Sequence, residues 1–424
     1  MSDLSCSVSL VAHRYRMTPT GAQAEVMREW CAHARTVWNV GLEQRNVCFE
    51  LARRRGVKPP KVDKYEQKRQ LSEARSAIEW LGAGPSVVHQ QALLDLDQAF
   101  QNWWKNPGHF GRPTWRKAGI HEGFTIRDVK ITKLSRKWAQ VLVPKVGYVR
   151  FRLHRPLPAA HGQGRVTLDR AGRWHVSFAA AQPTVERTNT DTHVGVDVGI
   201  AHTLTLSNGD HIDMTRLLSP GEAQRLRRLQ RRLARQQKGS NRRGRTKASI
   251  AALKAKERNR RKDFIEQTTT QLVRSFDTIA IEDLAVSNMV RSARGTIEQP
   301  GRNVAAKRGL NREILARGWG GFRLRLEQKA TATPEQHRCV VVAVNPANTS
   351  RRCARCAHTS PDNRKSQAVF ECQSCGHSSN ADVNAAINIL AAGLAVTGRG
   401  GTPHAITAQR PNEASTSVNH EEAA

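Results

Sequence analysis

Three carboxylates, Asp197, Glu282 and Asp382, each lie beside an apolar run although they are far apart in the chain. Carboxylate oxygens are the ligands that Mg²⁺ and Mn²⁺ prefer in proteins. Two such ions, about 3.5 to 4 Å apart, can activate a water molecule and stabilise the leaving oxygen of a phosphodiester. If the fold brings these residues together, the sequence predicts a two-metal phosphodiester hydrolase whose products carry a 5′ phosphate and a 3′ hydroxyl.

Asp197 lies in a segment typical of a strand with one buried face. Residues 194–200 alternate strictly, with valines on the buried face and Asp197 between two glycines on the other. We expect these glycines to leave room for a metal and a phosphodiester. Residues 202–207 predict a second strand, and the turn signal Asn208-Gly209 predicts that it pairs antiparallel with the first. A hairpin of this kind opens an RNase H-like sheet.

The other two acids are predicted at the ends of regular elements. Residues 277–283 predict a strand with Glu282 at its carboxyl end, where a parallel neighbour of the first strand would bring it to Asp197 and leave Asp283 pointing away. The apolar spacing after Asp382 predicts a helix that has this residue in its first turn and that Gly393 can end. An acid in the first turn of a helix is common on electrostatic grounds alone, so this position is not specific by itself.

Four cysteines form two Cys-x-x-Cys pairs, Cys353 with Cys356 and Cys372 with Cys375. Fifteen residues separate the pairs, which is the spacing of a zinc ribbon with four thiolates on one tetrahedral Zn²⁺. Four protein ligands leave no open position, so the sequence predicts a structural zinc. The other four cysteines are scattered singly and favour small buried side chains over a disulfide framework.

The chain is strongly basic. Lys and Arg number 68 against 36 Asp and Glu, a formal net charge of +32. Such an excess favours a nucleic-acid partner, because cationic side chains displace the counterions condensed on phosphates. Charge alone equally fits an electrostatic binder without chemistry. Since the sequence has neither a long apolar run nor a leader pattern, we expect a cytoplasmic protein that is not associated with a membrane.

The charge is concentrated in residues 222–263, which contain seventeen Lys or Arg and three acidic residues. Leucines at helical spacing, broken near residues 239–244, predict a helical hairpin. It can be an ordinary solvated hairpin or a basic arm that lies on phosphates. The candidate phosphate ligands are Arg227, Arg228, Arg231, Arg232, Arg242 and Arg243, together with Arg364 between the cysteine pairs.

The predicted fold class is α+β with several domains. Short strand-like runs between residues 107 and 185, with the N-terminal strand, predict an antiparallel β-barrel into which helices are inserted. A polar stretch at 183–192 predicts a domain boundary. The expected layout is a barrel at 1–18 and 107–185, a helical lobe at 19–106, a nuclease domain at 192–345 and 380–396, a zinc ribbon at 346–379 and a disordered tail at 397–424.

Several short motifs are spread along nearly the whole chain. They are Tyr15-Arg-Met-Thr-Pro-Thr20, Arg35-Thr-Val-Trp-Asn39, Val196-Asp-Val-Gly-Ile200, Ile281-Glu-Asp-Leu284, Gly318-Trp-Gly320, Thr349-Ser350 before Cys353, and Asp382-Val-Asn-Ala-Ala386. In these motifs the chain resembles the TnpB (OrfB) family of nucleases encoded by bacterial insertion sequences. The resemblance is specific because all of the motifs coincide.

The resemblance implies an RNA-guided DNA endonuclease. In such a protein a guide RNA from the element's end pairs with one strand of double-stranded target DNA, a short motif beside the target is read by the protein, and a RuvC-like domain cuts. It further implies two Mg²⁺ ions, a structural Zn²⁺, one monomer per guide RNA, a barrel that is the wedge domain and a helical lobe that is the recognition lobe.

The chain departs from the family pattern in two places. Asn380-Ala-Asp382 stands where many relatives have Asp-Arg-Asp, and Glu327-Gln-Lys329 lacks the usual aromatic residue. The missing arginine at Ala381 removes one supporting phosphate contact, while all three predicted catalytic acids remain.

Three other functions stay open at this point. A compact type V CRISPR effector has the same combination of nuclease domain and ribbon. A nuclease-inactive, guide-dependent repressor arises when the acids are lost, and they are intact here. A DNA strand transferase is the least favoured, because its acids usually run Asp, Asp, Glu along the chain.

Overall fold

The computed structural model describes residues 10–58, 62–158 and 162–398. Two compact units divide the chain, one of residues 1–182 and 220–255 and the other of residues 183–219 and 256–424. We predicted a nuclease domain at residues 192–345 and 380–396. Within that range, residues 220–255 group with the first unit and not with the second. The predicted tail lies almost entirely outside the described residues.

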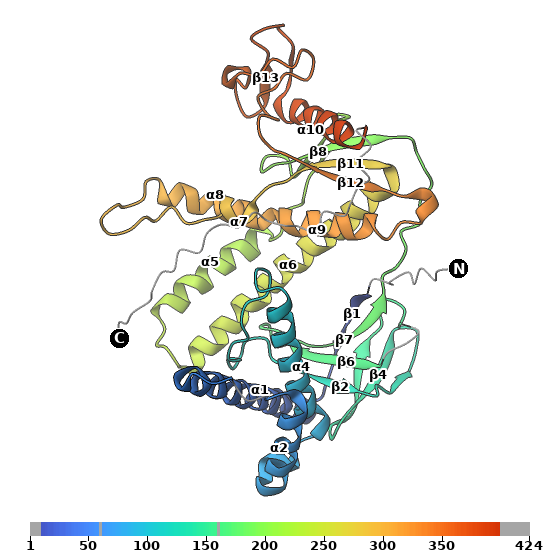
Figure 1. Ribbon diagram of the computed structural model, residues 1–424. Coiled ribbons are helices and arrows are strands. Elements are labelled where there is room, and N and C mark those ends of the chain that lie inside the picture. Colours follow the sequence, from blue (N-terminus) through green and yellow to red (C-terminus); the bar gives the residue numbers. More distant parts are fainter. Residues whose placement is uncertain (1–9, 59–61, 159–161, 399–424) are drawn as a thin grey trace. The chain divides into compact units, whose positions relative to one another are not determined.

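The first unit contains a curled, seven-stranded antiparallel sheet (Figure 1). Its strands follow the order β2-β6-β7-β1-β5-β4-β3, with the N-terminal strand β1 (Leu10–Met17) between β7 and β5. One face of all the longer strands shares a single core that contains Tyr15, Ile126, Val141 and Phe178. We predicted an antiparallel barrel at this place. The structure has a curled sheet whose end strands β2 and β3 share no ladder among the described residues. The other strands are β2 (Gly123–Arg127), β3 (Ile131–Lys133), β4 (Trp138–Val143), β5 (Gly147–Arg152), β6 (Gln163–Leu168) and β7 (Trp174–Ala181).

Helices are inserted between the first two strands in sequence, as predicted. The long helix α1 (Gly21–Arg55) begins at a capping box, in which Thr20 and Gln23 exchange hydrogen bonds, and ends at Gly56 in the left-handed conformation. It packs against α4 (Ser86–Lys105) through a small apolar cluster that includes Leu42 and Phe100. The shorter helices are α2 (Lys64–Ala77) and α3 (Glu79–Ala83).

The basic segment forms the predicted helical hairpin, α5 (Pro220–Arg235) and α6 (Asn241–Ser275). Gly239 has a positive φ of 87° in the turn, where a residue without a Cβ avoids strain. The second helix starts before Gly244, so only the first of the two glycines breaks the helical pattern. The division between the two units falls within α6, between Ala255 and Lys256.

The second unit is built on a five-stranded mixed sheet in the order β10-β9-β8-β11-β12. β8 (His193–Val198) and β11 (Thr278–Glu282) are parallel, as are β11 and β12 (Val340–Val344). One face packs on α6 and α9 (Trp319–Ala330) through a core with Val196, Ile281 and Leu326. The helix α10 (Ala381–Gly398) covers the other face. The remaining elements are α7 (Val286–Met289), α8 (Val304–Arg317), two short 3₁₀ turns (Glu335–His337 and Pro361–Asn363), β13 (Val369–Glu371) and β14 (Ser378–Asn380).

The opening hairpin pairs as expected, but by a different turn. β9 (Leu204–Leu206) is antiparallel to β8, and residues 199–203 connect them. The Asn208-Gly209 turn instead joins β9 to β10 (His211–Ile212). A short loop follows β8 directly. It is closed by a hydrogen bond from the Gly199 amide nitrogen to the Thr203 carbonyl oxygen, which are 3.3 Å apart.

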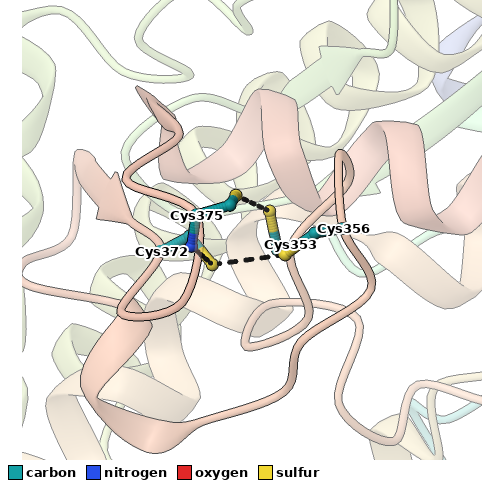
Figure 2. Close-up of side chains that lie close together, drawn as sticks. All are labelled: Cys353, Cys356, Cys372 and Cys375. Carbon is teal, nitrogen blue, oxygen red and sulfur yellow. Dashed lines mark hydrogen bonds between the residues drawn. The ribbon is translucent and has the colours of Figure 1, made fainter.

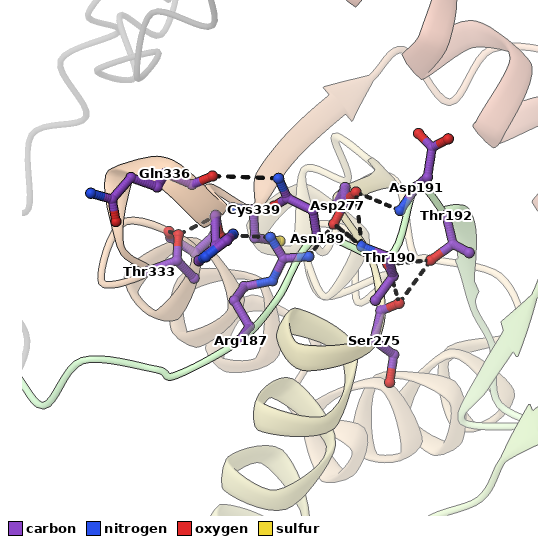
Figure 3. Close-up of polar contacts among 12 residues, drawn as sticks. Arg187, Asn189, Thr190, Asp191, Thr192, Ser275, Asp277, Thr333, Gln336 and Cys339 are labelled. Atoms are coloured by element: carbon purple, nitrogen blue, oxygen red, sulfur yellow. Dashed lines mark hydrogen bonds and ion pairs between the residues drawn. The ribbon is translucent and has the colours of Figure 1, made fainter.

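The predicted boundary segment, residues 183–192, is anchored on the second unit (Figure 3). Arg187 has a fully buried side chain that pairs with Asp277 and donates to the carbonyl of His337 at 2.7 Å. Asp277 also accepts from the backbone amides of Thr190 at 3.2 Å and Asp191 at 2.8 Å. The segment has no regular secondary structure. These contacts hold it at the amino end of β11, whereas Glu282 lies at the carboxyl end of the same strand.

The helix α10 is long and apolar enough to cross a membrane by length and composition alone, with a mean hydropathy of 1.3 over 18 residues. Its first turn contains Asp382, and one side of it, including Ala386 and Ile389, is buried on the sheet. These contacts are those of a core helix.

Candidate active site and zinc site

Asp197 is placed by β8 on the sheet face that α10 covers. A Cβ at Gly195, two residues earlier, would lie 2.0 Å from the Ala386 carbonyl oxygen and 2.9 Å from the Leu390 Cβ. This glycine therefore lets α10 approach the strand closely. Our expectation that it leaves room for a metal was wrong. A Cβ at Gly199 would lie 2.7 Å from the His202 carbonyl oxygen, so the second glycine serves the tight loop. The two glycines position Asp197 through close backbone packing.

Glu282 is the last residue of β11, as predicted. The parallel register sets Ile281 opposite Val196, which brings Glu282 beside Asp197 at the carboxyl ends of both strands. The Thr349 hydroxyl donates a hydrogen bond to Glu282 Oε1 at 2.6 Å. The next residue, Asp283, forms an ion pair with Arg323.

Asp382 lies in the first turn of α10, also as predicted. Asn380 caps this helix, because its Oδ1 accepts from the amides of Asp382 at 2.9 Å and Val383 at 3.2 Å. The asparagine that departs from the family pattern thus performs the capping that an aspartate would. The predicted end of the helix at Gly393 is wrong: the helix continues to Gly398, and a Cβ at Gly393 would lie 2.5 Å from the Ala280 Cβ.

Arg364 contacts an acidic residue of this cluster. Its Nη2 donates to Asp382 Oδ1 at 3.0 Å and to the Gln367 carbonyl at 3.2 Å. Asp382 is 6 % exposed, whereas the Arg364 side chain is 26 % exposed, so water reaches the pair from the arginine side. Arg364 was predicted as a phosphate ligand. In the structure its guanidinium contacts one of the predicted acids, and its role toward a phosphate stays a prediction.

The electrostatics of the cluster indicate a shortage of positive charge. Burial, followed by the negative charges of Glu282 and Asp382, raises the pKa of Asp197 to about 7, against smaller opposite effects of Arg364 and the Val198 amide. Burial also raises the pKa of Glu282, which the hydrogen bond from Thr349 opposes. Three hard oxygen ligands with unbalanced negative charge fit a site for Mg²⁺ or Mn²⁺.

The four predicted cysteines converge in space (Figure 2), and Cys353 and Cys372 pack against Ala381, the first residue of α10. All four sulfur atoms lie within 4.8 Å of one another. Among the described residues the three carboxylates do not come together as closely as this. The Cys353 and Cys375 sulfurs are 3.8 Å apart and those of Cys356 and Cys372 are 3.5 Å apart. A tetrahedron with Zn–S bonds of about 2.3 Å has edges of about 3.8 Å, so the four thiols fit Zn²⁺.

The two cysteine pairs form matching turns. In the first, the Ala357 amide donates to the Cys353 carbonyl at 2.9 Å, and in the second the Gly376 amide donates to the Cys372 carbonyl at 3.0 Å. Both residues are left-handed, with φ of 64° at Ala357 and 66° at Gly376. Only glycine adopts this conformation without strain, so the first turn carries a small cost that the second does not.

The candidate arginines on the basic hairpin are divided by the structure. Arg227, Arg228, Arg231, Arg232 and Arg242 are exposed. Four side chains of α5, Arg228, Arg231, Arg232 and Arg235, line one shallow surface hollow. Arg243 is different, because its guanidinium donates to the carbonyls of Leu233 and Gln236 and thereby closes the turn of the hairpin. We predicted a phosphate ligand at this position. The structure shows a contact of its Nη1 within the hairpin turn, and the phosphate contact stays a prediction.

Sequence reasoning missed the polar residues that surround the acids. Thr349 was noted only as part of a motif, and Asn384 and Asn388 were not singled out. Asn384 is fully buried and Asn388 is 9 % exposed. The sequence pattern could have indicated Asn384 and Asn388. They lie four residues apart in an otherwise largely apolar helix, and buried amide groups must find hydrogen-bond partners.

Comparison with known families gives three matches. Residues 175–293 match the family described as "Probable transposase" (OrfB_IS605), and residues 319–389 match the Cas12f1-like TNB domain. Residues 9–51 match a family described as a helix-turn-helix domain. In this chain the N-terminal segment matched by the helix-turn-helix family is the strand β1 followed by one continuous helix, so the family's name does not describe its structure.

The chain also has relatives of similar length. The "Putative RNA-guided DNA endonuclease InsQ" of Escherichia coli (strain K12) is 37% identical over 395 residues, which cover 91% of this chain and 93% of that one. A protein of Streptomyces pristinaespiralis with the name "Putative RNA-guided DNA endonuclease" is 30% identical and covers 92% of this chain and 90% of that one. The CRISPR-associated endodeoxyribonuclease Cas12f1 of Sulfoacidibacillus thermotolerans is 26% identical over 52% of this chain and 50% of that one.

Among solved structures, the Cas12f1–sgRNA–target DNA complex contains a chain with the same overall fold. The TM-score is 0.52 at 13% sequence identity, and the match covers 87% of this chain and 83% of that one. The α+β fold is thus shared with a compact effector of low sequence identity. With the acid cluster, the four-cysteine site and relatives that match over nine-tenths of the sequence, the chain belongs to the TnpB (OrfB, IS605-type) family, to which the compact Cas12f effectors are related.

Proposed function

We propose that this protein is an RNA-guided DNA endonuclease, associated with a transposable element, that cuts target DNA by Mg²⁺-dependent hydrolysis. The observation that supports the proposal is that Asp197 and Glu282 lie side by side on parallel strands, with Asp382 near enough to raise the pKa of Asp197. The names of the two relatives that match over most of the chain support the same activity.

The three acids would hold two divalent ions, with the sheet and α10 fixing their directions. When bound, these ions supply a nucleophilic water and stabilise the leaving 3′ oxygen, which gives products with a 5′ phosphate and a 3′ hydroxyl. Asp197 and Glu282 lie on adjacent strands and therefore move little relative to each other. Arg364 holds Asp382 and has further donors for a phosphate oxygen. One zinc ion on the four cysteines has a structural role.

The proposed partners are a guide RNA transcribed from the end of the element and double-stranded target DNA with a short adjacent motif, with one protein monomer per guide. The net charge of +32 suits a protein that grips an RNA–DNA hybrid by its backbone, because base pairing then supplies the sequence specificity. The exposed arginines of α5 and α6 are the proposed contacts to phosphates. DNA as substrate places the protein in the bacterial cytoplasm with the nucleoid.

The alternatives fit less well. A compact type V CRISPR effector would have the same site, but the Cas12f1 relative matches only half of the chain, whereas the InsQ relative matches 91% of it. A nuclease-inactive repressor is disfavoured because all three acids are present and the fold gathers them.

The test is to express the protein together with its flanking genomic DNA, sequence the RNA that copurifies, and measure cleavage of a matched double-stranded target with Mg²⁺. We expect one discrete RNA from the end of the element and cleavage that Asp197→Ala abolishes. Asp283→Ala is the matched control, because this neighbour of Glu282 pairs with Arg323 outside the acid cluster. Absence of a discrete RNA, or equal cleavage by Asp197→Ala and the parent, would refute the proposal.

A further inference from the structure

The hydroxyl of Thr349 is directed at one of the proposed catalytic acids. Oγ1 lies 2.6 Å from Glu282 Oε1 and 3.1 Å from the Pro346 carbonyl oxygen. An ionised carboxylate has no proton to donate, so the single hydroxyl proton of Thr349 must serve as the donor to Glu282. Thr349 is 8 % exposed, and little water can replace this donor. The carboxylate of Glu282 therefore depends on Thr349 for its direction.

The backbone of Thr349 is itself held by α10. The Asn388 side chain donates from Nδ2 to the Thr349 carbonyl at 2.9 Å and to the Arg352 carbonyl at 2.7 Å. One turn earlier, Asn384 also donates to the Arg352 carbonyl, at 2.8 Å. Both asparagines lie on the helix whose first turn contains Asp382, so Thr349 links the strand that ends at Glu282 to that helix.

The same segment leads into the zinc site. Cys353 follows Arg352, and the amide of Ala354, inside the first cysteine pair, donates to Asn384 Oδ1 at 3.0 Å. A residue between the two cysteine pairs, Arg364, contacts Asp382. The ribbon therefore touches the acid cluster at two points, through Thr349 on one acid and through Arg364 on another.

We propose that Thr349 is a positioning residue for metal binding at the acid cluster, and that α10 and the zinc ribbon hold it in place to fix the carboxylate of Glu282. The proposal rests on the proposed function only in that it assigns divalent ions to this cluster. Hydrogen-bond partners behind a metal ligand fix its orientation, and their loss typically lowers metal affinity or activity 10- to 100-fold. A free glutamate side chain has three rotatable bonds, so losing one such partner allows directions that do not face the metal.

The first experiment measures Mn²⁺ binding to the purified, zinc-loaded full chain by the loss of the free-ion paramagnetic resonance signal. Thr349→Val keeps the shape and removes the hydroxyl, and we expect it to weaken Mn²⁺ binding at least about tenfold. Thr349→Ser keeps the hydroxyl and should stay within about twofold of the parent. Thr331→Val is the matched control, because its hydroxyl donates to the Gln328 carbonyl at 2.9 Å and touches no acid.

A double-mutant comparison separates positioning from simple packing. In a Glu282→Gln background, Thr349→Val should cause little further loss of Mn²⁺ affinity, because the carboxylate that it orients is gone. An equal loss in both backgrounds would overturn the proposal, as would a Thr349→Ser variant that binds Mn²⁺ at least about tenfold more weakly than the parent. The serine result holds as a test even if the valine variant does not fold.

Cleavage of a guided target gives the second readout. Thr349→Val should shift the Mg²⁺ concentration for half-maximal cleavage upward about tenfold, with target DNA binding unchanged. Unchanged Mg²⁺ dependence would contradict the proposal. If the parent cuts no target under any condition, the proposed function fails, while the Mn²⁺ titration still decides the role of Thr349.

Discussion

Arg364 donates a hydrogen bond to Asp382 across the interface between the ribbon and α10, with 3.0 Å between Nη2 and Oδ1. The two residues are eighteen positions apart, and the second cysteine pair lies between them. A cation from one element thus orients an acid from the next, in a cluster whose other members are acidic.

Replacement of Arg364 should impair cleavage more than DNA binding. We expect Arg364→Ala to slow single-turnover cleavage at least about tenfold, because Asp382 loses its orienting partner and a phosphate loses a charged donor. Affinity for the target should stay within about threefold, since the chain has many other cations. Quench-flow cleavage and filter binding measure the two effects. Arg355→Ala, an exposed change inside the first cysteine pair, is the control and should leave both unchanged.

The raised pKa of Asp197 makes the acid cluster a source of instability without Mg²⁺. The folded protein holds this proton up to about pH 7, whereas an unfolded chain releases it near its ordinary value of 3.8. Between these values the folded state binds more protons, so stability falls as the pH rises through this window and the full loss is present above pH 7.

Asp197→Asn should therefore raise the melting temperature of the Mg²⁺-free protein at pH 8 by at least about 3 °C and change it little at pH 4. Differential scanning calorimetry at both pH values measures the effect. Addition of Mg²⁺ should stabilise the parent more than the variant. A variant that melts below the parent at pH 8 would contradict the electrostatic account.

Gly195 should tolerate no side chain, because a Cβ there would lie 2.0 Å from the Ala386 carbonyl oxygen. This contact is with the backbone of α10, so the helix itself would have to move. We expect Gly195→Ala to destabilise the protein by several kcal/mol, at the high end for a single substitution. Gly221→Ala, where no atom lies within 4 Å of the new Cβ, is the control and should be neutral. Urea denaturation distinguishes the two.

Ala357 offers a stabilising change. Its φ of 64° matches the 66° of Gly376 at the same place in the second turn. Ala357→Gly removes the strain of a left-handed alanine and should stabilise the ribbon by up to about 1 kcal/mol, whereas Gly376→Ala should destabilise it by a similar amount.

The rate of zinc release to a chelator measures this difference and should fall in Ala357→Gly and rise in Gly376→Ala. The parent should contain one zinc ion per chain, and Cys372→Ser combined with Cys375→Ser should lose it. Cys48→Ser, outside the ribbon, should keep it. Retention of zinc by the double variant would contradict the four-thiolate site.

The sequence by itself determined the local features of the site. Strand alternation around Asp197, the position of Glu282 at a strand end and the start of a helix at Asp382 depend on residues within one or two turns of each acid. The cysteine spacing is likewise a local property, because each turn supplies two ligands that the chain has already set at the right separation.

Only the tertiary structure decided how distant elements meet. Gly195 serves the approach of α10, almost two hundred residues away, and not a metal. Thr349 reaches Glu282, Arg243 closes its own hairpin and Arg364 contacts Asp382. Such contacts depend on which faces pack together, and many distant partners are compatible with the same local pattern. For this reason the positions of the three acids on their strands and helix could be predicted, whereas the side chains that contact them could not.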